Sequence, residues 1–283
     1  MAGAAQLEGL TVALLVPTAQ AEDAHYYDKD GTPCHGTLRE ARKRGAYPSP
    51  TSTLGAVLAR PGLDFFKQSQ AIASALTLPR KDDEPLHEFS ARVIEDSRKE
   101  VQAAAERGSY VHTLSHAAAL KIEPDDLRPE FARHYEVLKF WAKGILKVHK
   151  AEDVVINHDE GYAGRVDLIA TIGDEDENEV EVIDFKTRKF KKVGKFAEGN
   201  PGVCTIGDPH KVDAYDTDIL QLSAYAFAVF EEPVAARSVY IDPATAAIHD
   251  HIWTKEDVAE AFEVFKNVMA IWRWQKKYDP RDV

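Results

Sequence analysis

Cysteine is nearly absent from this sequence, because 283 residues contain only Cys34 and Cys204. Two thiols cannot build a four-thiolate zinc site or hold an iron–sulfur cluster, and they allow at most one disulfide bond. The sequence therefore excludes a cofactor held by a cysteine cluster. It fits the reducing environment of a cytoplasm.

Long apolar runs are absent as well, since no stretch approaches the 18 or more apolar residues of a membrane-spanning helix. Residues 10–16 form a short apolar run, and the Ala-Gln-Ala of residues 19–21 imitates a signal-peptide cleavage site. However, no Lys or Arg precedes the run, whereas Glu8 does, and a signal peptide begins with basic residues. We therefore expect neither a membrane span nor a signal peptide.

An excess of positive charge is the third absence. The chain has 35 Lys and Arg against 47 Asp and Glu, which gives a formal net charge of −12. This balance excludes a protein coated in positive charge for indiscriminate nucleic-acid binding. The remaining composition, 44% hydrophobic and 29% charged, is that of an ordinary globular chain.

The first half of the chain reads mainly as helix. A turn at residues 28–31 predicts a hairpin, and a short basic helix follows it until Gly45. Apolar residues at helical spacing then predict further helices, of which the later ones cover about 85–107, 109–121 and 129–147, with Gly108 breaking the first from the second.

The second half begins with strands. Three β-rich runs, at residues 153–157, 164–172 and 179–187, are separated by turn residues and predict an antiparallel meander. An apolar helix at 218–230, a strand–turn–strand unit at 238–253 and a final helix capped by Thr254 follow. The order α, βββ, α, ββ, α indicates an α/β fold with an N-terminal helical extension.

Charged residues interrupt two of these apolar strands. Asp184 and Lys186 lie two apart and share one face, whereas Ile183 and Phe185 point to the opposite layer. The antiparallel partner strand can bring Asp167 alongside. Two carboxylates that close repel each other unless a cation lies between them, and their oxygen atoms suit Mg²⁺ or Mn²⁺.

Lys186 next to such a cation would orient or help deprotonate a water molecule, or stabilise charge that develops on phosphorus. This chemistry is the hydrolysis of a phosphodiester. For an isolated Asp-x-Lys, however, the more frequent interpretation is a buried ion pair without catalytic purpose. Further motifs reverse that preference.

The strings GRVD, VIDFKT and QLSAY, in this order, resemble the PD-(D/E)xK nuclease superfamily and in particular its RecB-type branch. The resemblance implies a restriction-endonuclease-like core, a central mixed sheet flanked by helices. It also implies that Asp167 and Asp184 bind metal, that Lys186 activates water, and that Gln221 and Tyr225, one helical turn apart, support the site.

The same branch carries a histidine in a G-x-x-x-H setting, which residues 108–112 match. The resemblance implies His112 as an additional metal ligand and the Phe185 carbonyl as a further one. Imidazole suits Mn²⁺ well, so Mn²⁺ is expected to work beside Mg²⁺. His116 lies one turn further on, but a zinc-peptidase motif needs Glu where Thr113 stands, so His116 is interpreted as structural.

The resemblance extends toward the N-terminus. Residues 25–33 and 47–54 are similar to phage and prophage RecB-like exonucleases, and more distantly to mitochondrial genome maintenance exonuclease. The resemblance implies two parts of the chain: a hairpin and helical extension at residues 1–107, and a nuclease core at residues 108–283. The 34 residues between Lys186 and Gln221 exceed those of compact members, and the cysteine count excludes the iron–sulfur relatives.

Residues 186–195 contain six basic residues and no acidic one. Such a run is usually a solvated surface, but beside a phosphate-cleaving centre it favours gripping of the DNA backbone. The Phe190 and Phe196 rings would be available to stack on bases. The acidic string at 174–181 is expected to be a solvent-facing hairpin tip. The expected DNA-binding residues are Arg188, Lys189, Lys191 and Lys192.

Together these features predict a divalent-metal-dependent DNA exonuclease of phage-type recombination or repair, in the cytoplasm of a bacterial or phage-infected cell. Its substrate would be a DNA strand end, single- or double-stranded, and a single-strand annealing or binding protein is a plausible partner. Two alternatives stay open: a structure-specific or flap endonuclease, and an inactive DNA-binding accessory protein. The sequence does not decide cleavage polarity, DNA against RNA, or oligomeric state.

Overall fold

The centre of the molecule is a five-stranded sheet with strand order β10-β9-β6-β5-β4. The computed structural model describes residues 25–174, 178–192, 210–211 and 214–282, without the side chains of 191–192 and 210–211. The strands are β4 (Ile145–Asn157), β5 (Tyr162–Gly173), β6 (Asn178–Thr187), β9 (Ala236–Ile241) and β10 (Ile248–Trp253).

The sheet is mixed. Strands β4, β5 and β6 form the expected antiparallel meander, whereas β6 and β9 pair in parallel. A parallel pair requires a crossover, and here it runs through β7 (Lys191–Lys192), β8 (His210–Lys211) and the helix α6 (Asp216–Val229). The expected strand–turn–strand unit is the antiparallel pair β9–β10.

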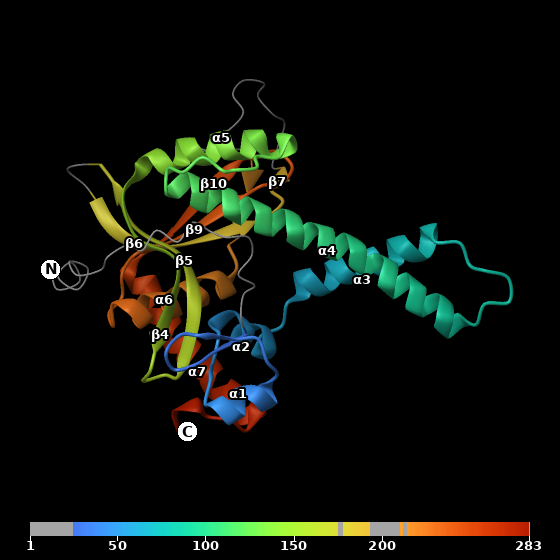
Figure 1. Ribbon diagram of the computed structural model, residues 1–283, viewed down its shortest axis with the longest axis horizontal. Helices are drawn as coiled ribbons and strands as arrows, with labels where there is room; N and C mark the ends of the chain where they lie inside the picture. The colour runs from blue at the N-terminus through green and yellow to red at the C-terminus, as the bar shows by residue number, and fades with distance from the viewer. Residues whose placement is uncertain (1–24, 175–177, 193–209, 212–213, 283) are drawn as a thin grey trace.

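Helices cover both faces of the sheet (Figure 1). Helices α4 (Leu86–Ala119) and α5 (Ala132–Trp141) enclose one hydrophobic cluster, which takes in Ile183 and Phe185 of β6. Helix α6 packs on the other face, over Val182 of β6, and α7 (Lys255–Lys276) packs against α6. The alternation of β6 between two layers is therefore confirmed.

The N-terminal part of the chain packs on this sheet. A small sheet of β1 (Tyr26–Tyr27), β2 (Pro33–Cys34) and β3 (Tyr47–Pro48) meets Ala163 of β5 through two tyrosine rings. Helix α1 (Leu38–Arg44) ends at Gly45, whose φ of +66° is the left-handed cap expected of glycine. Helix α2 (Pro50–Val57) contacts α6 and α7.

Beyond α2, the chain forms a helical arm. Helix α3 (Pro61–Thr77) and the first half of α4 run side by side and project away from the sheet (Figure 1). The remaining short helical turns are of 3-10 type and lie at Pro129–Phe131, Ala142–Gly144 and Pro280–Asp282. None of the helices in the described part of the chain combines the length and apolar character that a membrane span requires.

Three expectations about these elements are wrong. Helix α4 is continuous from Leu86 to Ala119, so Gly108 does not break it and the boundary expected at 107/108 lies inside a helix. The helix expected to reach 147 ends at Trp141, and β4 begins at Ile145. Glu181, expected at a solvent-facing tip, is buried and forms a bidentate ion pair with Arg237 of β9, at 2.6 and 2.7 Å.

The helical continuity of α4 can be tested at Gly108. A Cβ atom added there would lie 3.8 Å from Thr187 Oγ1, which is an ordinary contact. Glycine in a helix interior costs about 0.5–1 kcal/mol relative to alanine. Gly108→Ala should therefore raise the free energy of unfolding by about this amount in urea titrations.

The matched control is Gly164→Ala on β5, where the added Cβ would lie 2.9 Å from Pro50 Cδ and from Tyr225 Cε1. This variant should lose stability. A loss of stability in Gly108→Ala would instead mean that α4 breaks at this position.

Candidate functional site

The site begins where β5 and β6 separate. Their pairing ends at Leu168–Ile183, although β5 continues to pair with β4 as far as Tyr162. Val166 belongs to the cluster under α6, while Leu168 belongs to the cluster under α4 and α5. Val166 and Leu168 thus contact opposite layers, and the change occurs at Asp167, the residue between them.

Asp167 fills the opening that this separation leaves. Its Oδ2 accepts a hydrogen bond of 2.8 Å from the backbone N–H of Phe185, which has lost its partner on β5. Because the N–H and C=O of one strand residue point toward the same neighbour, the Phe185 carbonyl faces this opening too. The two positions that the resemblance names are thus side by side.

On β6, Asp184 and Lys186 form a close ion pair, with 2.6 Å between Asp184 Oδ2 and Lys186 Nζ. One side chain of helix α6, Gln221, forms hydrogen bonds with both of them. Gln221 donates from Nε2 to Asp184 Oδ1 at 3.2 Å and accepts from Lys186 at its Oε1, also at 3.2 Å. Its Nε2 also donates to the Tyr225 hydroxyl at 3.1 Å. The predicted Gln221–Tyr225 pair therefore contacts the predicted Asp-x-Lys pair.

The electrostatics of this group follow from burial. Burial raises the pKa of Asp184 to about 7, and Lys186 only partly offsets the effect, because Asp167 also repels the ionised form. Burial acts to lower the pKa of Lys186, but the carboxylates of Asp184 and Asp167 outweigh it and raise the pKa. Lys186 is thus held as a cation, and Asp184 lacks sufficient compensating charge.

His112 approaches Asp167 from α4. Its Nδ1 lies 3.6 Å from Asp167 Oδ2, and its side chain is 30% exposed. Partial burial is the largest influence on the pKa of His112 and lowers it, against the smaller opposing effect of Asp167. The imidazole is therefore held neutral, which is the form that binds metal ions.

Two further residues lie at this site: His116, which the sequence analysis interprets as structural, and Glu152, which it does not single out. The ligand atoms of His112, His116 and Asp167 all lie within 4.8 Å of one another. His116 Nε2 is 2.5 Å from Oε1 of Glu152, which reaches the site from β4. The i, i+4 spacing of the two histidines was the available signal, whereas nothing in the sequence pairs Glu152 with them.

The basic run after β6 lies in part within the described residues. Arg188 forms an ion pair with Asp218 at 2.8 Å, and its guanidinium stacks 3.5 Å from the Tyr215 ring. Lys189 is exposed. Phe190 is only 5% exposed, so the expectation that its ring stacks on bases is wrong.

Lys191 and Lys192 form β7, but their side chains lie outside the described residues, as does all of Phe196.

The donor set fits a divalent cation. Asp184, Asp167 and the Phe185 carbonyl offer hard oxygen atoms, and His112 offers a neutral nitrogen. The Asp184 side chain is 2% exposed and its Oδ2 has no well-aligned hydrogen bond among the described residues, although Lys186 lies close to it. A buried carboxylate in this condition is stabilised by a bound cation.

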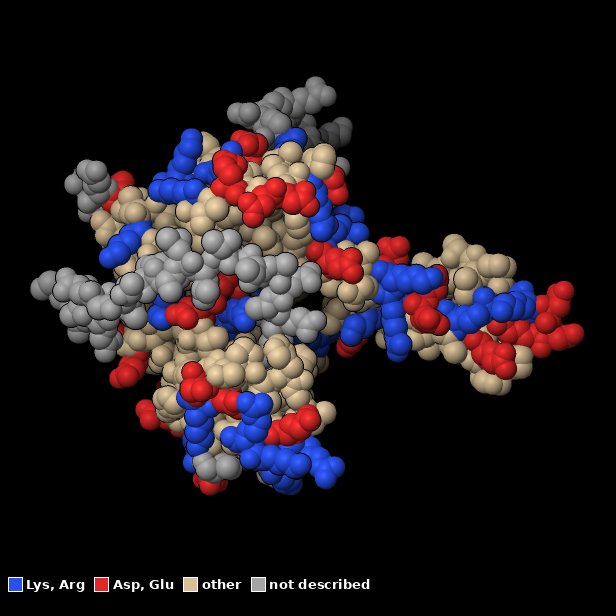
Figure 2. Space-filling model, in the orientation of Figure 1, with Lys and Arg blue, Asp and Glu red and all other residues tan. Residues whose placement is uncertain are grey.

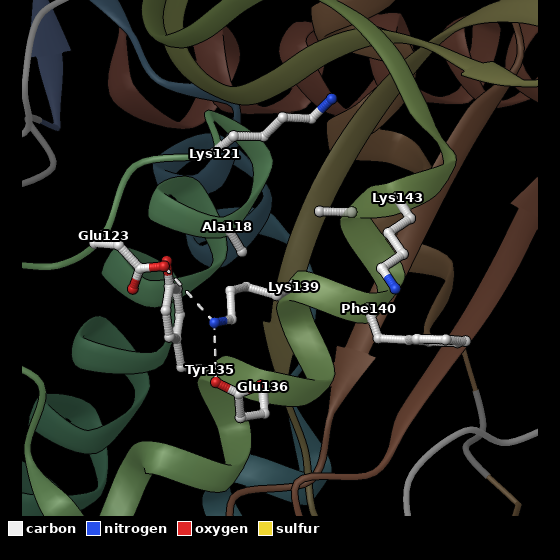
Figure 3. Close-up of a pocket in the computed structure, with 9 residues that line it drawn as sticks. Ala118, Lys121, Glu123, Tyr135, Glu136, Lys139, Phe140 and Lys143 are labelled. Carbon is white, nitrogen blue, oxygen red and sulfur yellow. Dashed lines mark ion pairs between the residues drawn. The ribbon is translucent and has the colours of Figure 1, made fainter.

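A separate cavity of about 560 Å³ opens between the end of α4 and helix α5 (Figure 3). Lys139 lies inside it between Glu136 and Glu123, at 2.9 and 3.7 Å. None of the predicted site residues lines this cavity, so it is not part of the candidate site. Its lining is Ala118, Lys121, Glu123, Tyr135, Glu136, Lys139, Phe140, Ala142 and Lys143.

Comparison of the chain with protein-family models finds no match, and comparison with curated proteins finds none either. The site is therefore interpreted from its own geometry.

The raised pKa of Asp184 predicts a pH-dependent stability. The folded pKa of about 7 lies above the ordinary 3.8, so the contribution of the neutral carboxyl group is fully present below about pH 4 and is lost as the pH rises through 7. In EDTA, the unfolding free energy of the wild type minus that of Asp184→Asn should fall by up to about 1.4 kcal/mol per pH unit across this range.

Urea titrations at pH 5, 6, 7 and 8 measure this difference. Asp82→Asn makes the same chemical change on the exposed turn between α3 and α4 and is the matched control. A difference that is constant across the four pH values would mean that Lys186 compensates Asp184 fully.

Proposed function

We propose that this protein is a divalent-metal-dependent DNA exonuclease with a restriction-endonuclease-like core of the RecB type. The observation that carries the proposal is the convergence of Asp167, Asp184 and Lys186 where β5 and β6 separate, with Gln221 bridging the last two. A purely structural Asp–Lys pair would need neither a second carboxylate nor an imidazole beside it.

The ligands of the cation would be His112, Asp167, Asp184 and the Phe185 carbonyl. A bound Mg²⁺ or Mn²⁺ supplies Lewis acidity at a phosphoryl oxygen and lowers the pKa of a bound water molecule. No iron–sulfur cluster takes part in this proposal. The carboxylates and the imidazole fix the position of the charge relative to Lys186.

The role of Lys186 is electrostatic. As a cation beside Asp184, it donates hydrogen bonds and stabilises negative charge on phosphate oxygens. Gln221 holds both members of the Asp184–Lys186 pair from α6. In-line attack of water on phosphorus then leaves a phosphate on one product end.

The substrate in this proposal is DNA, bound by its backbone at the basic run that follows β6. On the face that Figure 2 shows, Lys and Arg side chains are interspersed with Asp and Glu, including along the helical arm. Such a surface favours local rather than general DNA binding. Lys189 is exposed for this role, and Lys191 and Lys192 remain predictions. A single-strand annealing or binding protein and a cytoplasmic location belong to the same proposal.

DNA cleavage assays test the proposal. Linear DNA labelled at its 5′ or 3′ end should be degraded with Mg²⁺ or Mn²⁺ and not with EDTA, while a closed circle stays intact. Asp184→Asn and Lys186→Ala should each lower the rate at least about 10³-fold, because each removes charge that acts in the transition state. Lys255→Ala, which removes an exposed ion pair with Glu179, is the control that should retain the wild-type rate.

Two results would contradict the proposed exonuclease activity. Cleavage of the closed circle would identify a structure-specific or flap endonuclease. Metal-independent DNA binding without cleavage by the wild type would identify an accessory protein and overturn the enzymatic proposal.

The positioning role of Gln221 gives a second prediction. Gln221→Ala frees both Asp184 and Lys186, and loss of such a supporting partner typically costs about 10–100-fold in activity. Tyr225→Phe leaves both of those contacts in place and removes the hydroxyl group that accepts from Gln221, so it should cost less. Rates measured at saturating metal separate this effect from weaker metal binding, and equal losses in the two variants would contradict it.

A further inference from the structure

The starting observation is a buried histidine with one ring nitrogen unpaired within the described part of the chain. His116 is 2% exposed; its Nε2 lies against the carboxylate of Glu152, whereas its Nδ1 has no hydrogen-bond partner among the described residues. Buried polar atoms are almost always paired, because leaving one unpaired costs about 1–3 kcal/mol. The Nδ1 atom of His116 is the polar atom that this pairing leaves without a partner in the described residues.

His116 faces the candidate metal site. It lies one helical turn after His112 on α4, and a side chain at i+4 shares the face of the helix with the side chain at i. Its ligand atom lies within 4.8 Å of those of His112 and Asp167. Both imidazole rings pack edge-on against Phe185, with centroid distances of 6.4 Å for His112 and 5.6 Å for His116.

A carboxylate stands behind His116. Glu152 Oε1 lies 2.5 Å from His116 Nε2, and its other oxygen, Oε2, lies 3.5 Å from a guanidinium nitrogen of Arg165. Glu152 lies on β4 with a φ of +52°, a backbone conformation that costs a non-glycine residue free energy. A carboxylate that holds one nitrogen of a histidine and leaves the other for a metal ion is a recurrent arrangement.

We propose that His116 is a ligand of the cation held by His112 and Asp167, that Glu152 orients its ring, and that the site selects Mn²⁺ over Mg²⁺. This inference rests on the proposed function for the existence of the metal site. It goes further in naming a second imidazole and the metal that this imidazole favours.

The selectivity follows from ligand chemistry. Mg²⁺ prefers an octahedron of oxygen atoms and keeps several water molecules, so imidazole ligands add little to the affinity of a site for Mg²⁺. Divalent ions of the first transition series accept imidazole readily, and their affinity for nitrogen sites exceeds that of Mg²⁺. Two imidazoles among the ligands therefore shift the preference toward Mn²⁺.

Mn²⁺ binding to the purified protein tests the inference without any DNA. Electron paramagnetic resonance of free Mn²⁺ gives the dissociation constant, and spin-echo modulation of the bound ion detects directly coordinated ¹⁴N. The wild type should show two coordinated imidazoles. In His116→Gln, one imidazole should remain, the Mn²⁺ dissociation constant should rise about 10–100-fold, and the Mg²⁺ constant should change less than about threefold.

Two further variants complete the experiment. Glu152→Gln keeps both histidines, so it should retain two imidazole signals and weaken Mn²⁺ binding about 10-fold. His134→Gln removes a different buried histidine, on α5, and is the control for the effect of losing a buried imidazole on folding. Thermal unfolding of every variant accompanies the binding measurements.

The outcomes separate the two proposals. One imidazole in the wild type, unchanged in His116→Gln, overturns this inference and leaves the nuclease proposal intact. Two imidazoles on a protein that cleaves no DNA support this inference and overturn the nuclease proposal. No binding of Mn²⁺ or Mg²⁺ at millimolar concentration overturns both.

Discussion

The candidate site depends on one hydrogen bond, from the backbone N–H of Phe185 to the carboxylate of Asp167. Strand β6 needs a partner on both edges, and β9 supplies one edge from Val182 to Thr187. On the other edge the pairing with β5 ends at Leu168–Ile183, which would leave the N–H of Phe185 unpaired at a cost of about 1–3 kcal/mol. Asp167 removes this cost, and the same bond fixes its carboxylate next to Asp184. The opening of the sheet and the position of the acid therefore have a common cause.

The other residues of the site are polar side chains buried in apolar surroundings, which is unfavourable for folding. Helix α6 is apolar over most of its surface because it lies between the sheet and α7, yet Gln221 on this helix faces the sheet. A buried amide is tolerated here because its two ends have opposite partners: the N–H₂ group serves Asp184 and the carbonyl oxygen serves Lys186. Replacing the three polar side chains by apolar ones of similar volume would be expected to cost little or to stabilise the fold. Their presence is therefore better explained by chemistry than by folding.

The sequence predicts those features that depend on neighbouring residues. The meander, α6 and the Thr254-capped helix α7 follow from periodicity and turn residues, and the shared face of Asp184 and Lys186 follows from strand geometry. Contacts between residues far apart in the sequence could not be predicted from the local pattern. The burial of Glu181 depends on Arg237, which lies 56 residues away, and the continuity of α4 through Gly108 depends on the packing of its C-terminal half on the sheet. His116 was ambiguous for the same reason, since an i+4 histidine suits a core position as well as a metal site until Glu152 is placed opposite.

Helix α4 joins the helical arm to the site in one element. His112 and His116 lie in its C-terminal half, and its N-terminal half forms the arm with α3. An uninterrupted helix bends only gently, so the arm and the two histidines cannot change orientation independently. Because the arm points away from the sheet, α3 and α4 do not form an arch over the opening between β5 and β6 (Figure 1). Under the proposed function, contact with a strand end would therefore involve elements nearer to Lys186, such as the exposed Lys189 that follows β6.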